Sequence, residues 1–138
     1  MSATILTILA GRSLEARVNE ALGKHRLSLR LLGTLGHLSS SPEISYTELA
    51  HRARVTVQSM HSTVAELVAL GAVKQPAGGR GRTALLSLTA KGRRLLERGN
   101  ASVAVIDDRL AGVLPDGRGR LERDLLAVLA DGTPNDGR

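Results

Sequence analysis

Apolar residues recur at helical spacing along much of the 138-residue chain. In residues 56–70 they follow one another at steps of three, four and three, and so share one face of a helix: Val57, Met60, Val64 and Leu67. Thr56 stands at the position of an N-cap, and Gly71 stands where a helix commonly ends. The pattern therefore predicts one amphipathic helix between these two residues.

The preceding segment predicts a second, shorter helix over residues 46–54. Ser45 and Glu48 have the spacing of a capping box, in which the serine hydroxyl accepts from a backbone N–H and the glutamate reaches back to the serine N–H. Only Val55 and Thr56 separate this helix from the next. Two helices joined by such a tight turn form a helix-turn-helix.

The segment after Gly71 predicts a β-hairpin. Residues 72–75 and 83–88 have the pattern of two short strands, and residues 76–82 between them are rich in glycine and arginine. A hairpin that follows a helix-turn-helix is a wing. We therefore expect a mainly α fold with a small β-wing, in which a winged helix-turn-helix is flanked by helices at both ends.

The flanking segments have helical periodicity as well. Further helices are expected over residues 3–22, 27–38, 90–114 and 118–130, with Gly99 and Asn100 as a potential break in the third. Their apolar stripes exceed what the central module can cover, and pairing with a second copy would bury the surplus. This predicts a winged helix-turn-helix module at residues 27–96, a dimerisation region at residues 1–26 and 97–131, and a disordered tail at residues 132–138.

The composition favours a partner that carries phosphates. The net charge is +6 and the isoelectric point is about 11.0, as expected for a protein that neutralises a nucleic-acid backbone. The chain has one Tyr and no Phe or Trp, which argues against readers of single strands because those stack bases on aromatic rings. It has no cysteine, which excludes disulfides, thiolate catalysis and cysteine-ligated zinc.

The exposed side of the predicted helix 57–70 is polar and nearly uncharged at its N-terminal half. Side chains of this kind suit a helix in a DNA major groove, where they reach base edges: Gln58, Ser59 and Ser62, with His61 on the flank. Thr56 can offer a hydroxyl or N–H to a phosphate. The candidates for phosphate contacts are basic, namely Arg52, Arg54, Lys74 and Arg80, and Arg82 is the candidate for the minor groove.

Residues 29–96 resemble the MarR-type winged helix-turn-helix regulators. The resemblance rests on three motifs: Tyr46-Thr47-Glu48-Leu49-Ala50, Leu67-x-x-x-Gly71-Ala72-Val73, and Arg82 followed by Leu88-Thr89-x-x-Gly92. It implies a homodimer and a wing whose arginine, here Arg82, enters the minor groove. The wing aspartate typical of the family is replaced by Arg80, which adds positive charge.

The resemblance also implies a small organic ligand, an acid or a phenol, in a crevice between the DNA-binding lobe and the dimer helices. Such a pocket would be aliphatic here. Polar anchors are available but the sequence does not rank them: Arg12, Arg17, Arg30 and Tyr46.

We expect no metal, no cofactor and no catalytic site. The four histidines lack the i, i+4 spacing of a zinc pair, and Asp107 and Asp108 are adjacent, so on a helix their side chains diverge. No phosphate-binding loop, nucleophile elbow or dinucleotide fingerprint is present. No segment has the length and apolarity of a membrane span, and we expect a cytoplasmic protein.

These observations predict a sequence-specific regulator of transcription that binds double-stranded DNA as a homodimer at a pseudo-palindromic operator, most simply as a repressor that a ligand relieves. The alternative is a winged-helix module that binds protein and has no sequence-specific affinity for DNA. The two differ in their response to salt, because phosphate contacts weaken steeply as salt rises.

Overall fold

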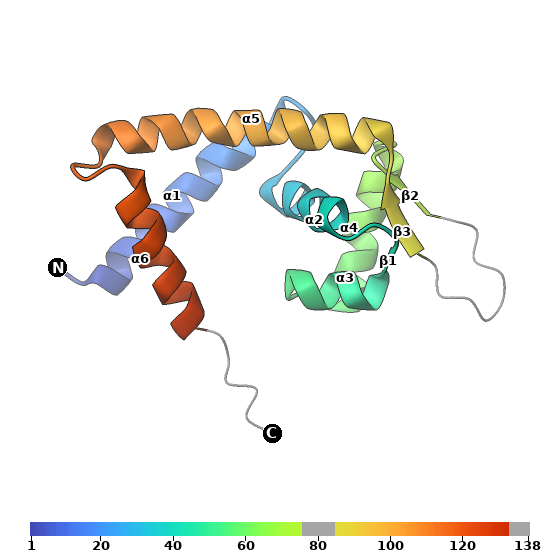
Figure 1. The fold of residues 1–138 in the computed structure, drawn as a ribbon, viewed down its shortest axis with the longest axis horizontal. Helices are drawn as coiled ribbons and strands as arrows, with labels where there is room; N and C mark the ends of the chain where they lie inside the picture. The colour runs from blue at the N-terminus through green and yellow to red at the C-terminus, as the bar shows by residue number, and fades with distance from the viewer. Residues whose placement is uncertain (76–84, 133–138) are drawn as a thin grey trace, which may run out of the picture. The chain divides into compact units, whose positions relative to one another are not determined.

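The computed structural model describes residues 1–75 and 85–132 (Figure 1). These residues fall into two compact units, Met1–Val103 and a second that begins at Ala104. The elements follow the order α1 (Ala3–Gly23), α2 (Leu29–Ser40), β1 (Ile44–Ser45), α3 (Tyr46–Ala53), α4 (Val57–Ala69), β2 (Val73–Lys74), β3 (Leu85–Leu88), α5 (Ala90–Val113) and α6 (Arg118–Asp131). The predicted fold class is confirmed.

The predicted N-caps of the helix-turn-helix are present. The Ser45 hydroxyl accepts the Glu48 N–H at 3.2 Å, and the Thr56 hydroxyl accepts the Ser59 N–H at 3.0 Å. The second half of the predicted capping box is wrong, because the Glu48 carboxylate bonds the Arg52 guanidinium at 3.0 Å. An i, i+4 ion pair on α3 thus takes the carboxylate that would otherwise turn back to the cap.

Helix α4 ends in a Schellman motif, as Gly71 predicted. Gly71 has φ +73°, a conformation that glycine adopts without steric strain. The Gly71 N–H donates to the Val68 carbonyl at 2.9 Å, and the Ala72 N–H donates to the Leu67 carbonyl at 2.9 Å. The chain therefore leaves α4 at once toward β2.

The wing strands belong to a three-stranded antiparallel sheet in the order β1-β3-β2. The strand predicted at residues 72–75 is present in shorter form as β2, and the described part of the strand predicted at residues 83–88 forms β3. Strand β1 was not predicted, because its two residues are too few for an alternating pattern. In this strand Ile44 pairs with Leu86 of β3. The predicted hairpin at residues 76–82 lies outside the described residues.

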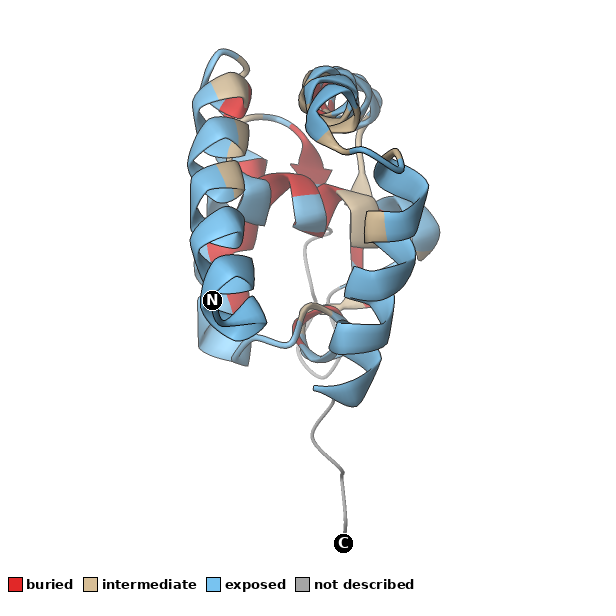
Figure 2. Ribbon diagram, turned by 90° about the vertical axis from the view of Figure 1, so that its left-hand side faces the viewer, coloured by how far each residue is buried: buried red, intermediate tan, exposed pale blue. Residues whose placement is uncertain are grey.

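The core of the first unit is aliphatic, with α2 and α4 supplying much of it (Figure 2). Helix α2 buries Leu31, Leu32, Leu35 and Leu38, as its leucine-rich pattern predicted. On α4 the assignment of Val57 to the buried stripe is wrong, because its side chain is 40% exposed. Thr63 is buried instead, and its hydroxyl donates to the Ser59 carbonyl at 3.1 Å.

Helix α5 runs without interruption, so the predicted break at Gly99 and Asn100 is wrong. Gly99 is buried, and a Cβ placed on it would lie 2.4 Å from a methyl carbon of Leu32. A Cβ on Gly92 would lie 2.1 Å from the Ala72 carbonyl oxygen. These glycines bring α5 close to α2 and to the start of the wing.

The N-terminal helix presents apolar side chains to solvent. On α1 these are Ile5, Leu6, Ile8 and Leu9, each between 45% and 55% exposed. The second unit, taken by itself, shows the same feature on α6, where Leu126, Val128 and Leu129 are between 59% and 67% exposed. The tail residues 133–138 lie outside the described part of the chain.

Candidate nucleic-acid interface

The N-terminal half of α4 is fixed from within and free on its outer face. Met60, Val64 and Leu67 anchor the helix in the core at 0–1% exposure. Gln58 and Ser62 are exposed, and within residues 1–75 and 85–132 their side chains form no hydrogen bond. Their amide and hydroxyl groups therefore remain available to base edges.

Thr56 and Ser59 are partly engaged within the protein. The Thr56 hydroxyl oxygen accepts the Ser59 N–H, and its own hydrogen remains available to a phosphate. Ser59 is exposed and also lines a cavity between α2 and α4. It thus stands at the border between the outer face of α4 and that cavity.

The basic candidates differ in how free they are. Arg54 is exposed in the left-handed conformation at φ 56°, and Lys74 is exposed on β2. Arg52 is held by two neighbours, the Ser41 hydroxyl and the Glu48 carboxylate. Arg80 and Arg82 lie outside the described residues. Of the described candidates, Arg54 and Lys74 have no ion pair with any described residue and are the freest to meet phosphates.

His61 meets an aromatic partner that the sequence did not reveal. Its ring stacks on Tyr46 of α3 with centroids 4.0 Å apart. Burial raises the pKa of the Tyr46 phenol, and a hydrogen bond from the Gln75 side chain opposes part of that rise. Tyr46 therefore connects the candidate recognition helix α4 with the residue that precedes the wing hairpin.

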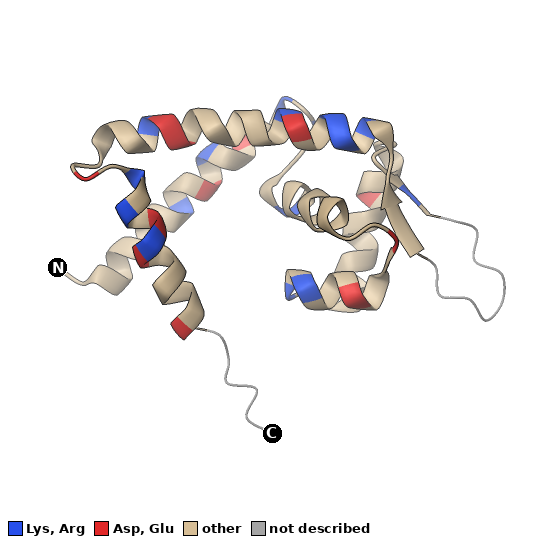
Figure 3. Ribbon diagram, in the orientation of Figure 1, with Lys and Arg blue, Asp and Glu red and all other residues tan. Residues whose placement is uncertain are grey.

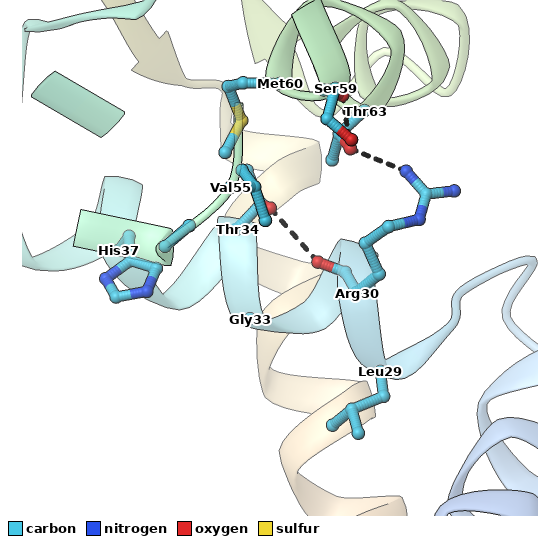
Figure 4. A pocket seen from close by; sticks show the side chains of 10 residues that line it. Leu29, Arg30, Gly33, Thr34, His37, Val55, Ser59, Met60 and Thr63 are labelled. Carbon is cyan, nitrogen blue, oxygen red and sulfur yellow. Dashed lines mark hydrogen bonds between the residues drawn. The ribbon is translucent and has the colours of Figure 1, made fainter. Parts of the chain in front are cut away.

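A cavity of about 230 Å³ lies beside the inner side of α4 (Figure 4). Its walls are apolar and hydroxyl-bearing side chains with one arginine and one histidine: Leu29, Arg30, Gly33, Thr34, His37, Ala53, Val55, Ser59, Met60 and Thr63. Of the four ligand anchors that the sequence offered, Arg30 is the one that lines this cavity.

Arg30 links α2 directly to α4. Its guanidinium donates to the Thr63 hydroxyl at 2.6 Å and to the Glu66 carboxylate at 2.5 Å (Figure 4 shows the first bond). Both partners lie more than thirty residues along the chain, and no local pattern reports such a contact. Sequence analysis therefore missed Glu66 and Thr63 as partners of this site.

No group of three or more histidine or carboxylate side chains in residues 1–75 and 85–132 is arranged to hold a metal ion. Of the helices described, none combines the length and apolarity needed to cross a membrane.

Comparison with known proteins gives close relatives. A scan against models of protein families finds no match. The HTH-type transcriptional repressor Rv2887 of Mycobacterium tuberculosis is 40% identical over 101 residues, which span 72% of this chain and 73% of that protein. The corresponding repressor Mb2911 of Mycobacterium bovis has the same identity and coverage.

Solved structures of the same relative match nearly the whole chain. The MarR family protein Rv2887 in complex with DNA is 32% identical, with a TM-score of 0.79 over 93% of this chain and 98% of that one. Its complex with salicylic acid is 35% identical, with a TM-score of 0.70 over 94% and 96%. The comparison of folds and the comparison of sequences therefore find the same relative, Rv2887.

Proposed function

The chain belongs to the MarR family of winged helix-turn-helix regulators, and from this membership we propose that it represses transcription by binding double-stranded DNA in a sequence-specific manner. A pseudo-palindromic operator would match a two-fold symmetric dimer. The complex of Rv2887 with DNA supports DNA as the partner.

One observation supports this proposal most directly: the outer face of α4 at Gln58 and Ser62. These side chains are exposed, uncharged and unbonded within the described residues, on a helix whose other face is buried at Met60, Val64 and Leu67. A rigid helix with free donors and acceptors suits direct reading of base edges. Base contacts would be extended from the start and flank of α4 by Thr56, Ser59 and His61. Phosphates would be contacted by the basic residues Arg52, Arg54, Lys74 and Arg80. Arg82 would enter the minor groove.

Selection of bound sequences from a random duplex pool tests the proposal. Enrichment of a two-fold symmetric motif is the expected result. The affinity for that motif should fall steeply with salt, because phosphate contacts release counterions. Retention of DNA without any motif would contradict sequence-specific regulation, and no retention at all would favour a module that binds protein.

We propose that two copies assemble through their flanking helices. The exposed apolar side chains of α1, and separately those of α6, are typical of surfaces that a partner covers. The test is the mass in solution, where a dimer is expected. Leu9→Asp should shift the population toward the monomer, whereas Leu29→Asp, which changes an exposed leucine of α2, should not.

We propose that a small organic acid in the cavity beside Arg30 relieves repression. The salicylic acid complex of Rv2887 supports this ligand class, and Arg30 supplies the positive charge that a carboxylate requires. Salicylate should weaken operator binding. Equal salicylate affinity for the free and the DNA-bound protein would contradict the switch, since a ligand shifts only states that it distinguishes.

We further propose that the chain acts by binding and not as an enzyme. Its relatives are named as transcriptional repressors. Asp107, one of the two adjacent aspartates, pairs with Arg118 at 3.3 Å in the second unit, which suits a structural role.

A further inference from the structure

A second cavity lies at the far end of α4 from the candidate DNA-reading residues. Its volume is about 180 Å³, and its lining is mostly basic: Lys24, His25, Arg26, Leu70, Lys91, Leu95 and Arg98. Leu70 is the C-cap of α4, so the thirteen-residue helix separates this cavity from Thr56 by roughly 20 Å. The basic positions come from the turn after α1 and from α5 (Figure 3).

The lysine and arginine residues that line this cavity have no acidic residue among them, although Glu66 lines the adjacent cavity that shares Arg26 and Leu70. Four lysine or arginine side chains line it, and no aspartate or glutamate does. Among the described residues none of these four forms an ion pair, whereas Arg30, Arg52, Arg118 and Arg120 all do. Like charges in one cavity repel each other, and an anion bound between them would relieve that repulsion.

The backbone conformation at Arg26 is a second indication, after the uniform charge, that this cavity binds a ligand. Arg26 has φ 60° and occupies the position after α1 that glycine favours, with its N–H donating to the Gly23 carbonyl at 3.0 Å. A left-handed conformation strains any side chain larger than hydrogen. An arginine at a position suited to glycine indicates that its side chain provides something that glycine cannot.

Arg98 is a third indication. The C-termini of α1 and α4 account for basic residues near them, because a helix C-terminus attracts cations. Lys91 is one of these residues, since its Cδ and Nζ lie 3.5 and 3.9 Å from where a Cβ would stand on Gly71, at the end of α4. This attraction does not account for Arg98 in the middle of α5.

We propose that this cavity binds a small oxyanion with at least two negative charges, of the phosphate or diphosphate class. Arginine and lysine residues from two parts of the chain line it, and such residues form the strong, charge-assisted hydrogen bonds that phosphates accept. Leu70 and Leu95 supply an apolar wall. The site is distinct from the proposed DNA face and from the cavity beside Arg30.

Calorimetric titration of the full chain with pyrophosphate, without DNA and at constant ionic strength, tests the proposal. Saturable binding is expected. Arg98→Gln and Lys91→Gln should each weaken it about tenfold, the effect of losing one charged hydrogen bond. Arg94→Gln is the matched control, since it removes an arginine of α5 that does not line the cavity. Circular dichroism establishes that each variant is folded.

Four results would contradict the proposal. The first is the absence of saturable binding once ionic strength is matched, and the second is an equal loss in Arg94→Gln, which would indicate general charge attraction. The third is a lowered salt dependence of DNA binding in the cavity variants without any pyrophosphate binding, which would make these residues DNA contacts. A parallel titration with citrate separates phosphate from carboxylate ligands, and tighter binding of citrate would contradict the phosphate class. Because the pyrophosphate titrations contain no DNA, the absence of saturable binding in them leaves the proposed regulatory function untouched.

Discussion

The imidazole ring of His61 stacks on the phenol ring of Tyr46, with ring centroids 4.0 Å apart and planes inclined by 22°. Tyr46 is the first residue of α3 and His61 lies in the first half of α4, so the pair fastens the two helices of the helix-turn-helix at their outer edge. Because the chain contains a single tyrosine and no tryptophan, the ultraviolet absorbance of the phenol comes from Tyr46 alone and reports on its contact with His61.

The titration of Tyr46 should therefore be visible as a single site. Burial raises its pKa in the folded protein above the ordinary value of 10.0, so the folded state keeps the phenol proton to higher pH than the unfolded state does. Stability from this group is full below pH 10 and is lost as pH rises through the folded pKa. Phenolate absorbance should show a higher midpoint in the native protein than in urea. An identical midpoint in both would contradict the burial of the ring, and Tyr46→Phe is the control for other groups that titrate in the same range.

Replacement of the two packed glycines of α5 should destabilise the fold to different degrees. Gly99→Ala would push against a leucine side chain that can shift, and should lower the free energy of unfolding by about 1–3 kcal/mol. Gly92→Ala would meet the Ala72 backbone, which cannot shift as easily, and should have the larger effect. Chemical denaturation measures both. Gly36→Ala is the control, because nothing lies within 4 Å of its added Cβ and the helix should gain up to about 1 kcal/mol.

The sequence predicted local structure well because local structure depends on neighbouring residues. The caps at Ser45 and Thr56 and the glycine end of α4 are present as expected, since each depends on atoms within one helical turn. The predicted break at Gly99 was wrong because the role of this glycine depends on a distant part of the chain. A glycine that makes room for a leucine of α2 and a glycine that ends a helix look the same in the sequence.

The same distinction holds at the candidate site. The polar outer face of α4 followed from helical spacing, whereas the Arg30 bonds to Thr63 and Glu66 depend on tertiary packing. Val57 was wrongly expected to be buried, and the buried position is Thr63, for which the sequence analysis made no prediction; a threonine hydroxyl can enter the interior once it is hydrogen-bonded.

The bond between Arg30 and Glu66 should compete with an acidic ligand. Glu66→Gln removes the carboxylate that occupies the guanidinium, and should tighten salicylate binding by a factor of roughly two to five, the range for exposed pairs. Arg30→Gln should weaken the same binding. Titration of salicylate into the free protein measures both, with Glu48→Gln as the control for loss of a similar pair on α3. Unchanged affinity in both Arg30→Gln and Glu66→Gln would place the ligand elsewhere.

Gln58 and Lys74 should affect DNA binding in different ways. Gln58→Ala should relax specificity at one base pair by about 1–3 kcal/mol and leave the salt dependence unchanged. Lys74→Ala should weaken binding to all sequences and flatten the log–log salt slope by about 0.9. Binding measured over a series of salt concentrations, with the selected operator and with a variant operator, separates the two. If Gln58→Ala changed only the salt slope, α4 would contact the backbone and not the bases.

Replacement of Arg54 by glycine should raise the stability of the fold and lower its affinity for DNA. It occupies the left-handed position at the end of α3, where glycine relieves about 1–2 kcal/mol of strain but adds about 0.5–1 kcal/mol of unfolded-state entropy. Arg54→Gly should therefore raise the free energy of unfolding by roughly 0.5–1 kcal/mol while it weakens operator binding through the loss of a phosphate contact. Arg52→Gly, which places glycine inside α3, should lower stability by about 1 kcal/mol and serves as the matched comparison. Increased stability with unchanged operator affinity would show that Arg54 does not meet DNA.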